Sequence, residues 1–170
     1  MLYETSTALR QNTDALMQNS VKQLGDNLDI QMEAYQDLLY QLYTGDDMVE
    51  WVDRINDDYD KPVTINQLRR YLRGILNSKD YIRSITIITE SGTEVTYNCI
   101  AATTYANSWI DNFSYSMEEL YYTISSDNKT HIYSTEYGTT FASEDYYLLH
   151  LGHRIIDYRK LEKENGIVIL

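Results

Sequence analysis

The hydrophobic positions of this chain change their period near residue 80. Over residues 3–43 apolar side chains recur at helical spacing, and no proline interrupts them. They are Leu9, Leu16, Leu24, Leu28, Tyr35, Leu38 and Leu42. At about 1.5 Å per residue, such a helix extends roughly 60 Å, more than the diameter of the domain that the remaining residues can form. We therefore expect one end of this helix to project or to pair with another chain.

The two halves of this helix differ in their apolar stripe. From Leu28 onward the stripe is broad, as in a helix that lies on a core. Before Leu24 the stripe is thin, because Thr13, Ser20 and Gln23 dilute it. A polar seam makes a poor independent coiled coil, so this half needs a neighbour or an anchored end.

Two shorter helices are predicted next. The sequence TGDD at residues 44–47 ends the first helix and provides Asp46 or Asp47 as a cap for a helix over about 46–57. After an acidic loop, Thr64 is the predicted cap of a third helix over about 65–78.

From residue 82 the pattern becomes that of strands. Gly92 supplies the positive φ of a hairpin between strands 82–89 and 94–99. Two helical pieces, residues 109–116 and 117–125, precede three more strands at 129–137, 146–157 and 166–170. The predicted fold class is α+β: a long N-terminal helix and short helices packed on a five-stranded antiparallel sheet. This order of elements is that of a PAS-like sensor fold.

Composition excludes several classes of protein. The formal net charge is −12, whereas a nucleic-acid or anionic-membrane surface requires a basic face. No run of about 18 apolar residues is present, so no transmembrane span is predicted. No signal peptide is visible, and the apolar run at residues 166–170 suggests a fragment of a longer protein.

Catalytic and metal chemistry find little support, so we predict no enzyme activity, cofactor or metal site in this chain. Cys99 is the single cysteine and has no histidine near it, which favours a buried thiol over a nucleophile. His150 and His153 lie three residues apart in a predicted strand, so they point to opposite faces of the sheet. The acidic loop at residues 57–60 lacks the glycine and distal glutamate of an EF-hand.

Aromatic residues provide the candidate ligand site. Tyrosine occurs 17 times and phenylalanine twice, which is typical of chains with many half-exposed apolar surfaces. The predicted ligand-binding residues are Tyr97, Tyr105, Trp109, Tyr121, Tyr133 and Tyr147, with Arg154 as a polar anchor. Two alternatives stay open: the tyrosines form core and interface contacts, and Arg154 pairs with a surface acid or with the long helix.

Four stretches carry a family resemblance. They are residues 19–48, 68–97, 148–159 and 164–170, which begin NSVKQLGD, LRRYLRGI, LLHLGHRI and ENGIVIL. They resemble the extracytoplasmic sensor region of bacterial two-component histidine kinases of the YesM type, which carries a PAS-like Cache domain. The constellation of amino-acid-binding Cache domains is not recognisable, so the resemblance implies no ligand class.

The resemblance implies a domain organisation and a function. Residues 1–43 are the expected stalk helix, and residues 44–170 the membrane-distal sensor module, which forms one structural unit with the helix. The implied function is ligand sensing on the extracytoplasmic side of the cell membrane, with a conformational shift passed along the helix. The implied partners are a small molecule or an extracellular protein, and a second copy in a full-length homodimer.

Three alternatives for function remain at this point. The first is the ligand-sensing domain of a histidine kinase. The second is a protein-interaction module whose sheet is filled by its own tyrosines. The third is the same sensor fold on a chemoreceptor or a cyclase.

Overall fold

The computed structural model describes residues 2–99, 114–138 and 146–170, with the side chains of residues 3–99, 114–133 and 149–170. The chain divides into two compact units, residues 1–37 and 38–170. Helix α1, Leu2–Thr44, contains the boundary, so the first unit is helix throughout its described length. The predicted long helix is confirmed.

The first unit exposes its apolar side chains. Leu9, Leu16, Val21 and Leu24 are each between 63% and 69% exposed, along the half of the helix for which a thin apolar stripe is predicted. In the second unit, Leu38, Leu39 and Leu42 of α1 are buried, as the broad stripe predicts.

Two helices follow α1. Helix α2, Asp46–Asn56, buries Met48, Val49, Val52 and Ile55, which share one face. Helix α3, Lys61–Ser78, buries Leu68, Leu72 and Leu76 at intervals of four residues.

The start of α3 differs from the prediction. The N-cap is Asp60, in the left-handed region with φ 44°, and not Thr64. Pro62 fits the first turn, because the amide hydrogen that proline lacks has no partner there in any helix. Thr64 lies inside the helix, where its Oγ1 donates to the carbonyl of Asp60 at 3.1 Å.

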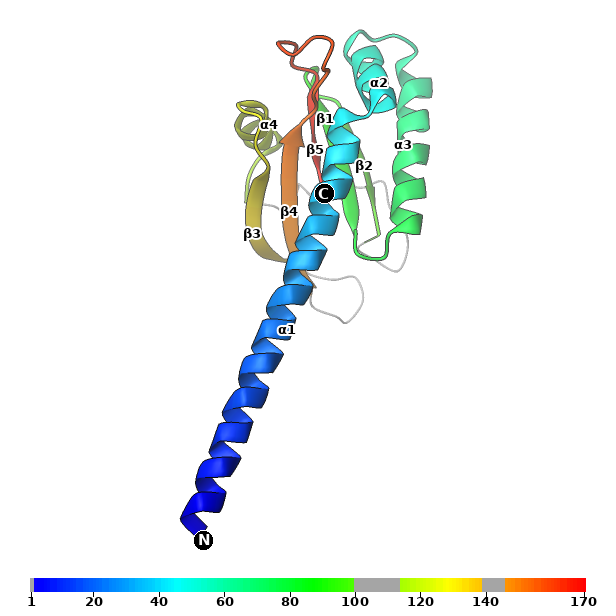
Figure 1. The fold of residues 1–170 in the computed structure, drawn as a ribbon. Helices are drawn as coiled ribbons and strands as arrows, with labels where there is room; N and C mark the ends of the chain where they lie inside the picture. Colours follow the sequence, from blue (N-terminus) through cyan, green and yellow to red (C-terminus); the bar gives the residue numbers. More distant parts are fainter. Residues whose placement is uncertain (1, 100–113, 139–145) are drawn as a thin grey trace. The chain divides into compact units, whose positions relative to one another are not determined.

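The sheet has five antiparallel strands in the order β2-β1-β5-β4-β3 (Figure 1). The strands are β1 Ser84–Thr89, β2 Glu94–Asn98, β3 His131–Gly138, β4 Tyr146–Arg154 and β5 Gly166–Ile169. Gly92 has φ 82° in the predicted β1–β2 hairpin. Strand β4 ends at Arg154; the amide of Ile155 still donates to the carbonyl of Gly166 at 2.8 Å, and the amide of Ile156 donates to the carbonyl of Tyr43 at 2.9 Å. With four helices and five strands in its described part, the chain has the predicted α+β fold, consistent with a PAS-like architecture.

Helix α4, Met117–Ser125, follows the segment 100–113. Its N-terminus is a capping box, in which Ser116 Oγ accepts from the amide of Glu119 and the Glu119 carboxylate accepts from the amide of Ser116. The predicted helix over 117–125 is confirmed, while most of the predicted piece at 109–116 lies outside the described residues.

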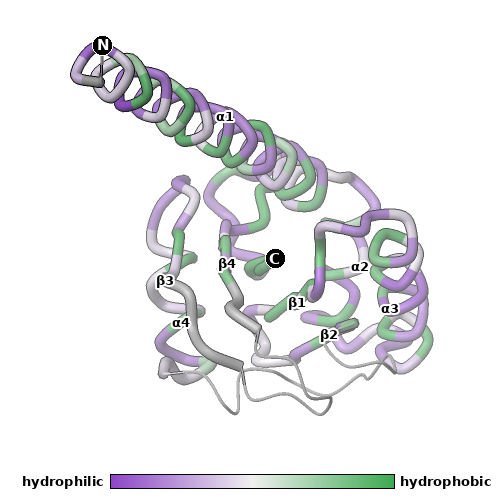
Figure 2. The backbone as a smooth tube through the Cα atoms, turned by 90° about the horizontal axis from the view of Figure 1, so that it is seen from below, coloured by the Kyte–Doolittle hydropathy of each residue, from purple (hydrophilic) through white to green (hydrophobic). Residues whose placement is uncertain are grey.

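The sheet has two faces, which we name by the helices they contact. On the α4 face, Ile88, Ile167 and Ile169 form a buried cluster with Leu120 and Ile124 of α4. On the α1 face, the ring of His153 stacks on the ring of Tyr43 in the last turn of α1. Figure 2 shows β4 between α4 and the end of α1, with hydrophobic residues along β1.

Candidate functional site

The α4 face is organised in three rows of side chains that run across the strands. Residues paired in a ladder share a face, and every second residue of a strand points the same way, so the register fixes each row. Adjacent rows lie about 7 Å apart. The first row is Glu94, Ile88, Ile167 and Arg154; the second is Thr96, Thr86, Ile169, Gly152 and His131; the third is Asn98, Ser84, His150 and Tyr133.

Helix α4 packs on the apolar part of this face. Its residues Leu120 and Ile124 are at most 1% exposed. Ile124 takes the place that a side chain on Gly152 would need, since a Cβ there would lie 2.5 Å from Ile124 Cδ1. The absence of a side chain at Gly152 therefore lets α4 approach β4.

The third row and its neighbours are polar and buried. We name six residues of the second and third rows the polar patch: Ser84, Thr86, Thr96, Asn98, Tyr133 and His150. All except the half-buried Tyr133 are at most 7% exposed. Burying an uncompensated polar group costs free energy, so a set of this kind in a sheet face requires partners.

Hydrogen bonding within the polar patch is uneven. The hydroxyls of Thr86 and Thr96 lie 2.6 Å apart and bond to each other across β1 and β2. Ser84 Oγ is buried and has no hydrogen-bond partner in the described part of the structure. An unpaired buried hydroxyl costs about 1–3 kcal/mol. Within the described residues, the Ser84 hydroxyl carries this cost.

Two further polar atoms lie around Ile88. Glu94 Oε1, beside Ile88 in the first row, and the hydroxyl of Tyr121, which packs against the Ile88 cluster, are both buried without a hydrogen-bond partner among the described residues. Burial, with smaller contributions from Glu164 and Glu90, raises the pKa of Tyr121 to about 12. The phenol of Tyr121 therefore stays protonated and able to donate at neutral pH.

The predicted tyrosines are divided between the two faces. Tyr133 belongs to the polar patch and makes an edge contact with the ring of Tyr115, with ring centroids 5.3 Å apart. Tyr121 packs on the same face. Tyr97 pairs with Ile85 and therefore lies on the α1 face.

The remaining predicted site residues provide little or no evidence for a ligand site. Tyr105 and Trp109 lie outside the described residues. Tyr147 pairs with Tyr137 in the sheet, and its side chain is outside the described part. Arg154 lies in the first row and donates from Nη2 to the carbonyl of Leu161 at 3.2 Å.

Sequence reasoning missed Ser84, Thr86, Thr96 and Asn98. The signal was present in the alternation of β1 and β2, where these residues alternate with Ile85, Ile87, Val95 and Tyr97. One face of the predicted hairpin is thus apolar or aromatic and the other carries hydroxyls and an amide. His150 was expected to be a surface or sheet-packed residue rather than a metal ligand, and its place in the polar patch depends on how β4 joins the sheet.

On the α1 face, His153 connects the sheet to the end of α1. Its ring lies 3.6 Å from the ring of Tyr43 at an interplanar angle of 8°. Its Nδ1 donates to the carbonyl of Arg154 at 2.6 Å. Burial lowers the pKa of His153. Hydrogen bonds of the ring with the backbone of Arg154 and Asn128 act in the opposite direction and raise it, but their effect is smaller. A neutral imidazole is therefore the form that this stack favours.

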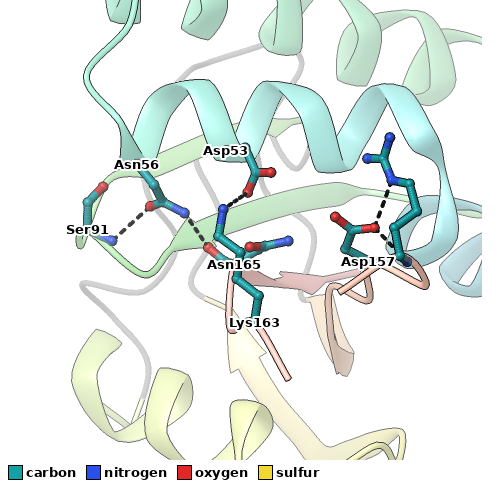
Figure 3. A network of polar contacts seen from close by, with 7 residues as sticks. Asp53, Asn56, Ser91, Asp157, Lys163 and Asn165 are labelled. Atoms are coloured by element: carbon teal, nitrogen blue, oxygen red, sulfur yellow. Dashed lines mark hydrogen bonds and ion pairs between the residues drawn. The ribbon is translucent and has the colours of Figure 1, made fainter. Parts of the chain in front are cut away.

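A second polar group joins α2 to the β1–β2 turn and the start of β5 (Figure 3). Asn56 accepts from the amide of Ser91 at 3.0 Å and donates to the carbonyl of Asn165 at 2.8 Å. Lys163 Nζ lies 2.9 Å from Asp53 Oδ1. Because each of these groups has a partner, the arrangement serves to hold α2 against the sheet.

The described residues provide no metal centre and no membrane span. In the part of the chain with described side chains, no three His, Cys, Asp or Glu residues come together to hold a metal ion. None of the helices described is both long and apolar enough to cross a membrane.

Comparison with models of known protein families and with curated proteins gives no match for this chain.

Proposed function

We propose that this chain is the ligand-sensing domain of a membrane-bound bacterial sensor histidine kinase and acts on the extracytoplasmic side of the membrane. The observation that carries the proposal is the polar patch, a set of buried polar side chains on the α4 face, with Ser84 Oγ unpartnered within the described residues. Small-molecule sites combine a mostly apolar lining with a few convergent polar groups, as on this face.

Strand β4 links the polar patch with α1. His150 points to the α4 face and His153, three residues later, to the α1 face, where it stacks on Tyr43. The two residues lie about 10 Å apart along the strand. A ligand held by His150 therefore acts on the same strand that contacts the last turn of α1.

Signal transfer then takes the form of a population shift. A ligand moves an equilibrium only through its different affinities for the two arrangements of β4 and the end of α1. Coupling energies between such sites are typically about 1–3 kcal/mol. The partners in this proposal are a small molecule and, in the full-length receptor, a second copy of the chain.

The test is a thermal-shift screen of the 170-residue chain against sugars, amino acids, peptides and polyamines. A ligand present at about 100 times its Kd adds about 2.7 kcal/mol, which raises Tm by about 5 °C or more. Hydrogen exchange with the ligand bound is expected to slow in β4 and in residues 38–44. The His153→Leu variant, which removes the stack on Tyr43, is expected to keep the first effect and lose the second.

Two results would count against this proposal. If no compound raises Tm, the alternative of a protein-interaction module gains support. If a ligand protects β4 but leaves residues 38–44 unchanged in the unmodified chain, binding occurs without the proposed coupling to α1.

A further inference from the structure

The ring of His153 lies where three parts of the chain meet. It is buried, and its Nδ1 lies 2.6 Å from the carbonyl oxygen of Arg154 in β4. One face of the ring stacks on Tyr43 in the last turn of α1, with the ring centroids 3.6 Å apart. The ring also forms a hydrogen bond with the backbone of Asn128, in the connection between α4 and β3. A change in the charge of this ring therefore acts on all three parts.

The neutral ring cannot satisfy both of its backbone contacts. Each of the two hydrogen bonds raises the pKa of His153, so each is made to a carbonyl oxygen that accepts from the ring; an amide donor would lower this pKa. A neutral imidazole carries one N–H, whereas an imidazolium carries two. While Nδ1–H donates to Arg154, the other ring nitrogen has no hydrogen for the carbonyl of Asn128. Proton uptake supplies this hydrogen.

Burial opposes the uptake of this proton. It has the largest effect on the pKa of His153 and lowers it, because the charged ring loses its hydration. The two hydrogen bonds to carbonyl oxygens strengthen when the ring is charged. The stack on Tyr43, in contrast, keeps one face of the ring away from water. Separation of Tyr43 from the ring therefore hydrates the charge and keeps both hydrogen bonds.

Two charged groups of opposite sign act on the ring within the described residues. Arg154, the next residue of β4, lowers the pKa of His153, and Asp127 raises it. Asp127 stays ionised, because hydrogen bonds from the Lys129 amide and the His131 ring lower the pKa of its carboxyl group. His131 Nε2 lies 2.8 Å from Asp127 Oδ1, so a second titratable ring lies near this junction.

The groups that face His153 from α1 and β5 stay uncharged. Burial raises the pKa of Tyr43, with smaller effects of Tyr158 and Tyr40, so the phenol keeps its proton at neutral and acidic pH. Strand β5 presents Val168, the ladder partner of His153. Between about pH 5 and pH 8, His153 is therefore the member of the stack whose charge changes.

We infer that His153 is a proton-operated switch: proton uptake by its ring separates Tyr43 of α1 from β4, while the five-stranded sheet stays paired. The hydrogen bond from the amide of Ile156 to the carbonyl of Tyr43 crosses the same junction and opens with it. This opening needs no ligand. Its role as a second signal that opposes the ligand rests on the proposed function, in which a bound ligand protects residues 38–44.

The test is hydrogen exchange of the ligand-free 170-residue chain at pH 7.5 and pH 5.5, corrected for the intrinsic effect of pH on exchange. Protection of the Ile156 amide is expected to fall about three- to tenfold at pH 5.5. The Ile155 amide is the matched control, because it donates to the carbonyl of Gly166 in the sheet and is expected to stay protected. The midpoint of the change at Ile156 is expected to coincide with the titration of the His153 ring, followed by NMR.

Three results overturn the switch. Equal loss of protection at Ile155 and Ile156 shows a general loss of stability. Unchanged protection at Ile156 shows that the junction stays closed, and increased protection shows that the charged ring is held on Tyr43 by cation–π attraction. Different midpoints for Ile156 and the His153 ring assign the opening to another group.

Two variants test the assignment to His153. His153→Phe keeps a ring for Tyr43 and is expected to abolish the pH dependence of protection at Ile156. His131→Gln removes the neighbouring titratable ring and is expected to leave this pH dependence intact. The opposite result in either variant overturns the assignment. The outcome is separate from the ligand screen, since a closed junction at pH 5.5 leaves ligand binding standing and a failed screen leaves the switch standing.

Discussion

The two faces of the sheet are both buried, but they satisfy their polar groups to different degrees. On the α1 face, Ile87 and Val95 are fully buried, and the hydroxyl of Thr89 bonds to Ser91 Oγ at 2.9 Å. On the α4 face, Ser84 and Glu94 keep buried oxygens without partners within the described residues. The buried residues of the α1 face therefore stabilise the fold. On the α4 face, the buried oxygens without partners lower the free energy of unfolding.

The largest expected effect is the loss of stability on truncation in β1, which tests whether both faces of the sheet are core. Ile87→Ala removes a fully buried side chain between Val95 and Val168 and is expected to cost about 3–4 kcal/mol of unfolding free energy. Ile88→Ala, one residue later, removes an equally buried side chain from the cluster on the α4 face and is expected to cost a similar amount. Urea unfolding followed by circular dichroism measures both. If Ile87→Ala costs less than about 1 kcal/mol, the α1 face is not the principal core.

The next difference concerns one glycine on each face. A Cβ on Gly166, on the α1 face, would lie 2.7 Å from the carbonyl oxygen of Ile88, whereas at Gly152 it would meet only the side chain of Ile124. A backbone atom of a central strand cannot move aside as a side chain can. We expect Gly166→Ala to cost about 2–3 kcal/mol and Gly152→Ala about 1 kcal/mol. The reverse order in urea unfolding would contradict this assignment of tight backbone packing.

The smallest expected effect is the pH dependence that His153 confers. Burial lowers its folded-state pKa below the ordinary value of 6.5, so the unfolded chain binds the proton first as the pH falls. The stability due to neutral His153 is complete above pH about 6.5 and is lost as the pH falls from there through the folded-state pKa. The neighbouring charges act in both directions, since Arg154 lowers the pKa and Asp127 raises it.

His153→Phe keeps an aromatic ring for Tyr43 and removes the titration. The loss of stability between pH 7.5 and pH 5.5 is expected to be smaller in this variant than in the unmodified chain. His131→Gln is the control, because His131 is half-buried, pairs with Asp127 and does not stack on α1. Equal pH dependence in His153→Phe and the unmodified chain would show that His153 does not titrate with folding.

Local sequence patterns were sufficient to predict most of the helices and strands and the fold class. The long helix, the β1–β2 hairpin at Gly92 and the strand at Gly166 follow from periodicity and turn residues that act over a few positions. The predicted start of α3 was wrong because Pro62 was not used as a signal for the first turn of a helix.

The candidate site was harder to predict from the sequence. Ser84 and Asn98 face the same side through local alternation, which the sequence contains. Their alignment with His150 depends on β5 pairing with both β1 and β4, a register set by contacts between residues far apart in the chain. Choosing tyrosines by residue type alone also grouped Tyr97 with Tyr133, although the two lie on opposite faces.

The central place of β5 has a consequence for biosynthesis. Strands β1 and β2, and strands β3 and β4, form two antiparallel pairs that, among the described strands, are joined in the sheet through Gly166–Ile169. The two halves therefore remain separate on the ribosome until the last of the five strands has emerged from the exit tunnel. Pairing across such long sequence separations is slow, so each new chain passes through an interval in which the exposed edges of β1 and β4 are open to chaperones and to aggregation.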